Sequence, residues 1–247
     1  MGDMFERTRL LTGDRGIQTL QQSRVVLFGV GGVGSFAAEA LARAGVGFIR
    51  LVDFDVVQES NLNRQLVALR STIGRHKTVV MQQRIADIHP GIQVNVFSEH
   101  YRPEHLQIEG EFDYCIDAID MVSAKVDLIS RAMERGLPVI SSMGAGNKLD
   151  NTRFQVTDIS RTHTCPLAKV VRRELRNRGI AKGVTVVYSE APVVEHRDNP
   201  ELEQGRPPVG SISFVPGTAG LILAGQVIND LLSRGMEDKE KTNGYTK

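Results

Sequence analysis

A glycine-rich segment near the start of the chain has the residue types and spacing of a nucleotide-binding turn. In GVGGVGSFAAEALARAGVGFIRLVDFD the spaced glycines are Gly29, Gly31 and Gly34, with Gly32 in addition. Residues without a Cβ atom let backbone N–H groups approach a phosphate where a helix begins, and the helix dipole favours the anion. Asp53 follows the next apolar segment, where a carboxylate accepts hydrogen bonds from ribose hydroxyls. The pattern predicts a nucleotide site but is shared by NAD and ATP sites.

The residues after Asp53 favour ATP over a dinucleotide. A pyrophosphate carries about two negative charges and a triphosphate about four, so ATP needs additional cations or Mg²⁺. NLNRQ places Arg64 and Gln65 just beyond the nucleotide edge of the predicted sheet, and GRHK places Lys77 at the start of the next helix. Arginine can hold phosphate oxygens in a bidentate fork, and lysine acts as a compact charge. We therefore predict that ATP binds this turn.

One carboxylate in the sequence is suited to hold the metal ion that accompanies ATP. Asp120, in DAID, follows a predicted strand at the edge where ligands of parallel sheets collect. A carboxylate at this position can hold Mg²⁺ against the phosphates. Asp117 lies inside the same strand, and we interpret it as structural.

Composition limits the class of protein. The chain has 247 residues, of which 41% are hydrophobic and 24% charged, which suits one large α/β domain. The net charge of +1 means that any nucleic acid must bind a local basic patch.

The two cysteines of the chain, Cys115 and Cys165, exclude a disulfide scaffold and a zinc site built from paired CxxC motifs, and they fit a reducing compartment. The N-terminus does not resemble a secretory signal, and polar residues interrupt the apolar segment 215–232, so we expect a cytoplasmic protein without a membrane span.

Strands and helices alternate through the first part of the sequence. Strands are predicted at 24–29, 48–54, 93–97, 112–119 and 137–142, with helices at 33–44, 77–88 and 124–135. This order predicts an α/β fold with a Rossmann-like, doubly wound, mostly parallel sheet and helices on both faces.

The regular alternation of predicted strands and helices ends at about residue 150. We assign residues 1–150 to a Rossmann-like, ATP-binding core and residues 151–233 to a smaller α+β part of the same domain, where the substrate is expected to bind. This second part contains strands at 152–159 and 184–189, a basic helix between them, and a final glycine-rich helix. The polar residues 234–247 are expected to form a disordered tail.

The basic helix in the second part has the charge pattern of a nucleic-acid-binding surface. In PLAKVVRRELRNRG, four cations follow the i, i+3, i+4, i+7 spacing of one helix face, and Val170, Val171 and Leu175 supply apolar contacts. The basic residues are Lys169, Arg172, Arg173, Arg176, Arg178 and Lys182. Such a row can follow a phosphate backbone with little sequence discrimination, although a solvated helix face has the same pattern.

The motifs together resemble the adenylating superfamily of ubiquitin-activating enzymes and their bacterial relatives that activate sulfur-carrier proteins. The similarity rests on GVGGVG, LVDFD, NLNRQ, GRHK and DAID, over roughly residues 5–150. It implies that ATP is cleaved to pyrophosphate as a carboxylate becomes an acyl-adenylate. It assigns Asp53 and its neighbour Asp55 to the nucleotide site, and Asp120 to Mg²⁺. The implied phosphate-side residues are Asn61, Arg64, Gln65 and Lys77, together with Arg7, which reaches the partner's ATP site in a homodimer.

Three longer segments resemble one branch of that superfamily, the tRNA threonylcarbamoyladenosine dehydratases. They are GVGSFAAEALARAGVG, ISSMGAGNKLDNTRFQVTDIS and THTCPLAKVVRRELRNRGI, and this resemblance extends to about residue 233. It implies that ATP activates the threonyl carboxylate of a modified adenosine beside the tRNA anticodon, and that the group then closes into a ring with net loss of water. Lys148 and Asp150, on the GAGNKLD loop, are expected to shape the substrate pocket. The resemblance leaves open a sulfurtransferase or cysteine desulfurase partner.

Other interpretations of the same residues remain. The main alternative is an adenylyltransferase for a ubiquitin-like sulfur-carrier protein; a nucleotide-sensing module without catalysis and an NAD dehydrogenase are further ones. Cys165 stands where the dehydratase pattern has an acidic residue, THTDP, and could be taken for the thioester cysteine of the carrier-protein activators. We expect Cys115 to lie in the core and His163 to form hydrogen bonds within a loop.

Overall fold

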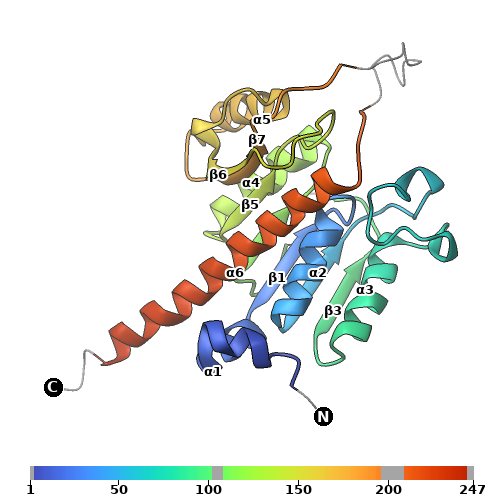
Figure 1. Cartoon of the computed structure of the whole chain (residues 1–247). Helices are drawn as coiled ribbons and strands as arrows, with labels where there is room; N and C mark the ends of the chain where they lie inside the picture. Colours follow the sequence, from blue (N-terminus) through green and yellow to red (C-terminus); the bar gives the residue numbers. More distant parts are fainter. Residues whose placement is uncertain (1–2, 102–107, 196–208, 244–247) are drawn as a thin grey trace.

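A twisted sheet forms the centre of the protein (Figure 1). The computed structural model describes residues 3–101, 108–195 and 209–243, with side chains described up to residue 235. The sheet has seven strands in the order β3-β2-β1-β4-β5-β7-β6. They are β1 (Arg24–Phe28), β2 (Phe48–Val52), β3 (Gln93–Phe97), β4 (Tyr114–Asp117), β5 (Val139–Ser142), β6 (Phe154–Asp158) and β7 (Thr185–Ser189). β6 is antiparallel to β7, and all other pairs are parallel.

Helices cover both faces of this sheet. They are α1 (Glu6–Gln22), α2 (Gly34–Ala44), α3 (Lys77–Ile88), α4 (Val122–Glu134), α5 (Pro166–Asn177) and α6 (Phe214–Asn243). One core joins α2, α3 and α6 to the sheet through residues such as Leu41, Ile85 and Leu223. A second core on the other face joins α4 and α5 through Leu128 and Val171. The predicted α/β, doubly wound, mostly parallel sheet is thus confirmed, and β6 and β7 extend it with residues of the second part.

The strand order reverses between β1 and β4. β2 and β3 lie on one side of β1, and β4, β5 and β7 lie on the other. Connections therefore leave the carboxyl ends of β1 and β4 in opposite directions, which opens a crevice there. The glycine-rich turn follows β1 and the DAID loop follows β4, so both predicted nucleotide segments meet at this point.

The first helix, α1, was absent from the sequence-based prediction. Only Gly16, Ile17 and Leu20 are buried on it, and Gly13 interrupts it with φ 67° and ψ 177°. This sparse apolar pattern explains why periodicity did not reveal the helix. Phe5, at its start, stacks on His89 beyond the end of α3, so α1 lies at the amino ends of the strands (Figure 1).

The C-terminal helix also differs from the prediction. α6 runs through Asn243, so residues 234–243 of the expected disordered tail 234–247 are helical, and residues 244–247 lie outside the described residues. Glutamate and lysine have high helix propensity and continue a helix that buried turns have already nucleated. By length and composition, residues 214–235 of α6 could span a membrane, but half of that segment is buried, as in the core helix of a soluble protein. It packs on α2 and α1, as Figure 1 shows.

A buried ion pair fixes the end of β4. Lys125 and Asp117 are both fully buried, and Nζ lies 2.7 Å from Oδ2. The ammonium also donates to Ser141 Oγ at 3.1 Å and to the Ser142 carbonyl at 2.9 Å. The other Asp117 oxygen accepts from the backbone N–H of Ile119. This network joins β4, β5 and α4 beneath the DAID loop, and it gives Asp117 a structural role.

Replacing one partner of this pair should therefore destabilise the whole domain. Lys125→Met leaves the Asp117 carboxylate buried and unpaired, and we expect the free energy of unfolding to fall by about 3–5 kcal/mol. Urea denaturation measures this loss. The double variant Asp117→Leu/Lys125→Met removes both charges and should lose less. A Lys125→Met protein with the wild-type urea midpoint would contradict this assignment.

Candidate active site

Two glycines of the turn are required by close backbone contacts. Gly29 has φ 87°, and a Cβ atom on it would lie 2.6 Å from the Ala118 carbonyl oxygen. A Cβ atom on Gly34 would lie 1.8 Å from the Gly29 carbonyl oxygen. Any larger residue at either position would separate β1, β4 and the start of α2. These glycines therefore position the turn at the reversal point of the sheet.

The other two glycines, Gly31 and Gly32, leave a cradle in front of the helix. A Cβ atom on Gly31 would meet nothing nearer than Gln65 Nε2, at 3.9 Å. One on Gly32 would lie 3.2 Å from Pro216 and 3.6 Å from Arg64 Cγ. The first N–H groups of a helix have no partner within the helix, so α2 offers donors to an anion in this cradle.

Asp53 holds the turn from the neighbouring strand. Its Oδ2 accepts a hydrogen bond from the Val30 N–H at 2.6 Å, and its Oδ1 accepts one from the Asp55 N–H at 2.8 Å. Burial raises the pKa of Asp53, and the nearby Lys77 ammonium partly offsets this rise. Each carboxylate oxygen keeps a second lone pair, so the side chain can still accept from ribose hydroxyls.

The long segment after β2 returns to the same edge of the sheet. A β-bridge between Val56 and His76 closes it, and the Lys77 N–H donates to the Asp55 carbonyl at 3.1 Å. Lys77 Nζ lies 2.6 Å from Asp55 Oδ2, and its side chain is only 5% exposed. The structure thus brings Lys77, Asp55 and Asp53 together, as the sequence analysis expected. Lys77 is paired with Asp55 rather than free to swing.

A turn inside this segment presents the remaining phosphate-side residues. Asn61 is buried and accepts from the Gln58 N–H through its side chain, while its carbonyl accepts from Arg64 and Gln65. Arg64 donates to the Ser60 carbonyl at 2.8 Å and borders Gly32. Asn61 therefore shapes the turn, and Arg64 and Gln65 face the cradle.

Gln65 shows that the cradle suits a polar ligand. The residue is 8% exposed, and its Oε1 has no hydrogen-bond partner among the described residues. A buried acceptor without a partner costs about 1–3 kcal/mol, and native structures rarely leave one unsatisfied. The same side-chain amide borders the cradle, because its Nε2 is the atom nearest to a Cβ built on Gly31, at 3.9 Å, so it can bond to a polar group of a nucleotide and the residues present fit ATP.

Sequence reasoning missed two residues of this site. Ser35 is buried, donates to the Gly31 carbonyl at 2.6 Å and accepts from the Leu66 N–H at 3.3 Å, which joins the glycine turn to the Arg64 turn. A serine one position into a helix after the glycines is a weak signal. Pro216, at the start of α6, walls Gly32 from a distant part of the chain, and no sequence pattern indicated it.

Asp120 lies beyond the end of β4 in the exposed part of the crevice. Its carboxylate forms no hydrogen bond or ion pair with any residue that the structure describes, and it remains open to a ligand. Within the described ranges, no group of three acidic, histidine or cysteine side chains could hold a metal on its own. Mg²⁺ commonly uses one or two carboxylates together with substrate phosphates and water. Asp120 fits that pattern only when ATP supplies the other oxygens.

Arg7 is far from the cradle of its own chain. It is exposed on α1, and α1 lies at the amino ends of the strands, whereas the glycine turn follows the carboxyl end of β1 (Figure 1). Arg7 could therefore act on ATP only in another copy of the chain.

Lys148 and Asp150 are neighbours in sequence, but their side chains turn to different partners. Lys148 is 4% exposed and donates to the Ser189 carbonyl at 3.3 Å and to the Ala191 carbonyl. Asp150 accepts from the backbone N–H and the hydroxyl of Thr152. The structure does not bring these two side chains together as one polar pair.

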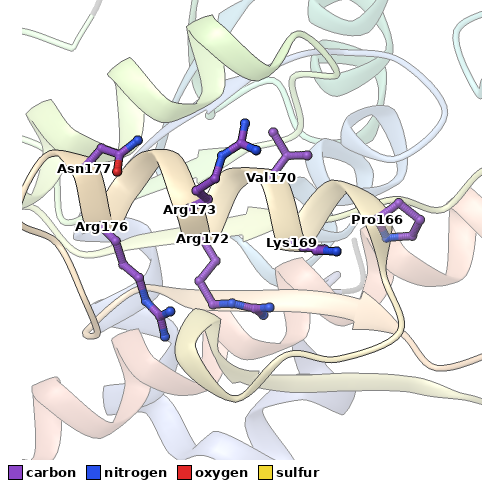
Figure 2. A pocket seen from close by; sticks show the side chains of 7 residues that line it. All are labelled: Pro166, Lys169, Val170, Arg172, Arg173, Arg176 and Asn177. Atoms are coloured by element: carbon purple, nitrogen blue, oxygen red, sulfur yellow. The ribbon is translucent and has the colours of Figure 1, made fainter.

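The cations of α5 divide into two groups. Arg172 donates to the Thr162 carbonyl and hydroxyl, and Arg178 lies 3.3 Å from Asp127, so both stabilise the fold. Lys169, Arg173 and Arg176 are exposed; Arg173 pairs with its neighbour Glu174. A surface hollow of about 610 Å³ lies beside the helix, and Figure 2 shows the side chains that line it. It is lined by Pro166, Lys169, Val170, Arg172, Arg173, Arg176 and Asn177. Lys182 is exposed beyond the end of the helix.

Both cysteines are buried. Cys115 lies inside β4, where burial raises the pKa of its thiol well above the ordinary range, in agreement with a core role. Cys165 is 4% exposed at the start of α5. His163 Nε2 lies 3.1 Å from the Tyr188 hydroxyl and 3.1 Å from Glu190 Oε1, which can only accept, and this is the hydrogen bonding expected of it.

Comparison with known proteins identifies the family. The model of the ThiF family matches residues 5–246. The chain is 48% identical to the tRNA threonylcarbamoyladenosine dehydratase of Bacillus subtilis (strain 168) over 239 residues, which cover 92% of this chain and 94% of that protein. It is 38% identical to the protein of the same name from Escherichia coli (strain K12) over 199 residues, 77% of this chain and 74% of that one.

Comparison with solved structures gives the same result as the sequence comparisons. The E. coli tRNA N6-threonylcarbamoyladenosine dehydratase TcdA, in complex with ATP, matches with a TM-score of 0.86 and 33% identity, covering 95% of this chain and 96% of that one. The resemblance inferred from the motifs is confirmed. The chain therefore belongs to the ThiF family.

Proposed function

We propose that this protein is an ATP-dependent tRNA threonylcarbamoyladenosine dehydratase. One observation carries the proposal: the similarity to these dehydratases covers nearly the whole chain, including α5 and α6, and not only the adenylating core. The glycine cradle, the unsatisfied Gln65 oxygen and the cations around them support ATP as the activating substrate. Since tRNA is the second substrate, the proposed site of action is the cytoplasm.

The reaction has two steps that share the site. In the first, a carboxylate oxygen of the threonyl group attacks the α-phosphorus of ATP, and pyrophosphate leaves. In the second, an internal nucleophile of the same side chain attacks the carboxyl carbon, the bond to AMP breaks, and a ring forms. The net change is the loss of one water, with no need for an enzyme thiol. A sulfurtransferase or cysteine desulfurase partner would therefore not be a reactant.

The residues of the cradle would act by position and charge. Asp53 would bind the ribose, with Asp55 holding Lys77 in place beside it. Arg64 and Lys77 would face the phosphates, where fixed cations stabilise the charge that develops as pyrophosphate leaves. Asn61 and Gln65 would complete the wall. Mg²⁺ would neutralise phosphate charge when bound, and Asp120 is the residue that would hold it.

We further propose that two copies of the chain complete the site. Arg7 is exposed on α1 at the edge of the sheet opposite to its own cradle. In a homodimer that brings α1 of one copy to the cradle of the other, its guanidinium would reach the partner's ATP phosphates.

The tRNA is proposed to bind over α5. Lys169, Arg173, Arg176 and Lys182 are exposed there, while Arg172 and Arg178 keep the helix in place through their contacts with Thr162 and Asp127. Lys148 and Asp150 would border the substrate group where it enters the site.

The first prediction tests the proposed reaction itself. The protein is incubated with ATP, Mg²⁺ and tRNA bearing threonylcarbamoyladenosine, and the digested nucleosides are analysed by mass spectrometry. We expect a nucleoside lighter by one water, formed together with AMP. An unchanged nucleoside with ATP bound, and pyrophosphate release stimulated instead by a ubiquitin-like carrier protein, would favour the adenylyltransferase alternative.

The second prediction concerns the phosphate-side arginine. Arg64→Gln removes the guanidinium of the side chain whose Cγ borders Gly32, and we expect the rate of tRNA-dependent pyrophosphate release to fall on the order of 100-fold. The matched control is Arg70→Gln on the same segment, whose guanidinium lies 3.9 Å from the exposed Glu59. Equal rates for the two variants would remove Arg64 from the site.

The third prediction concerns tRNA affinity. Lys169→Gln/Arg176→Gln removes two exposed cations of α5 and should weaken tRNA binding, most strongly at low ionic strength. The slope of log affinity against log salt should become shallower by up to about 1.8, because fewer counterions are released. Filter binding at several salt concentrations measures both effects. Arg43→Gln/Arg70→Gln removes the same charge elsewhere, and an equal loss in this control would contradict a specific role for α5.

A further inference from the structure

A lysine amine is buried at the carboxyl end of β7 without an acidic partner. Lys148 is 4% exposed, and no carboxylate pairs with it within the described ranges. Among the residues whose side chains the structure describes, the other two buried lysines are Lys77 and Lys125, and each lies within 2.7 Å of an aspartate oxygen. A buried ammonium without a counter-ion is costly, and perturbed lysines of this kind are found at functional sites.

The hydrogen bonds of this amine suit its neutral form. Nζ donates to two acceptors, the carbonyls of Ser189 and Ala191. A neutral amine has two N–H donors and one lone pair, so these two bonds leave the lone pair to accept a proton. Burial lowers the pKa of Lys148, which favours the neutral form, whereas the Cys165 thiol that faces it acts in the opposite direction when ionised.

The loop that carries Lys148 is joined to the nucleotide site. Asn147 exchanges two hydrogen bonds with Gly210, at 2.8 and 2.6 Å. The next residue, Ser211, accepts through its carbonyl from Asn63 at 3.0 Å, on the turn that presents the phosphate-side residues. Segment 209–213 therefore lies between the two and leads into α6, whose Pro216 walls the glycine cradle.

The backbone beside Lys148 is held in an unusual conformation. Asn147 has φ 55°, and Thr164, next to Cys165, has φ 57°. These are the two residues other than glycine with positive φ in the part of the chain that the structure describes. Such backbone costs energy, and it clusters where the surrounding structure fixes a functional side chain. The unusual backbone at Asn147 and Thr164 therefore agrees with a Lys148 side chain that the surrounding structure holds in one position.

We infer that Lys148 is the base that accepts the urea proton of the substrate as the ring closes. This inference rests on the proposed function and assigns a residue to its second step. The ring-forming nitrogen or oxygen of the threonylcarbamoyl group bonds to the carboxyl carbon, the carbon–oxygen bond to AMP breaks, and AMP leaves with the electron pair. Whichever atom closes the ring, one urea N–H proton is lost, and Lys148 Nζ takes it and becomes an ammonium.

The test separates the two steps in three proteins of full length: wild type, Lys148→Met and Lys148→Arg. Pyrophosphate exchange with ATP and modified tRNA measures adenylation, and mass spectrometry of the nucleoside in a single turnover measures ring closure. We expect ring closure to fall at least about 100-fold more than adenylation in both variants. Methionine has no basic atom, and the arginine guanidinium is not deprotonated in proteins.

A chemical rescue controls for changes in packing. Lys148→Ala leaves a space where the amine stood, and a small primary amine such as ethylamine added to the assay should restore ring closure. Wild-type protein and Lys148→Met assayed with the same amine are the matched controls, because neither has that space. Thermal melting and ATP binding show whether each variant is folded. If the methionine variant is unstable, ring closure in the rescued protein still tests the role of the amine.

Each outcome is decisive. Ring closure that is retained in Lys148→Arg overturns the inference, because a fixed cation then suffices. So does an equal loss of both steps in a folded variant, or a failure of the added amine to restore ring closure. If the wild type itself forms no ring, the proposed function fails first, and the inference falls with it.

Discussion

The contact between the backbone at Gly34 and the carbonyl of Gly29 is the constraint on which the site depends. No side chain fits between them, and the same turn presses Gly29 against the Ala118 carbonyl beyond β4. The start of α2 is therefore fixed at the reversal point of the sheet, with its N–H groups toward the crevice. Asp53 reaches this turn from β2 through the Val30 N–H, so three neighbouring strands meet at one anion-binding edge.

Distant segments then close around that edge by hydrogen bonds between loops. Ser35 joins the turn to the segment after β2, and Asn63 joins that segment to residue 211 before α6. The basic residues fall into two groups, one that holds the structure together and one that is free to bind a ligand. Lys77 and Lys125 are buried in aspartate pairs that fix geometry, whereas the exposed cations of α5 remain available to a polyanion.

The sequence predicted the elements that depend on local pattern. The glycine spacing, Asp53 and the basic spacing of α5 can be recognised from the sequence alone, and the observed sheet and its helices agree with the predicted fold. α1 was missed because its buried face is sparse, and the helix at 234–243 was missed because that sequence is polar and has no apolar periodicity. Pro216 and the partners of Lys148 come from remote parts of the chain, and pairing at that range has no local signal. The basic row of α5 could not reveal that Arg172 and Arg178 are held by Thr162 and Asp127.

The central claim is that ATP activates the threonyl carboxylate by adenylation in this cradle. Labelling the carboxylate of threonylcarbamoyladenosine in tRNA with ¹⁸O tests it most directly, because adenylation links one carboxylate oxygen to the α-phosphorus. After one turnover, the account predicts that one ¹⁸O atom is recovered in AMP and none in pyrophosphate or inorganic phosphate. Recovery of the label in inorganic phosphate, with ADP as the nucleotide product, would contradict it.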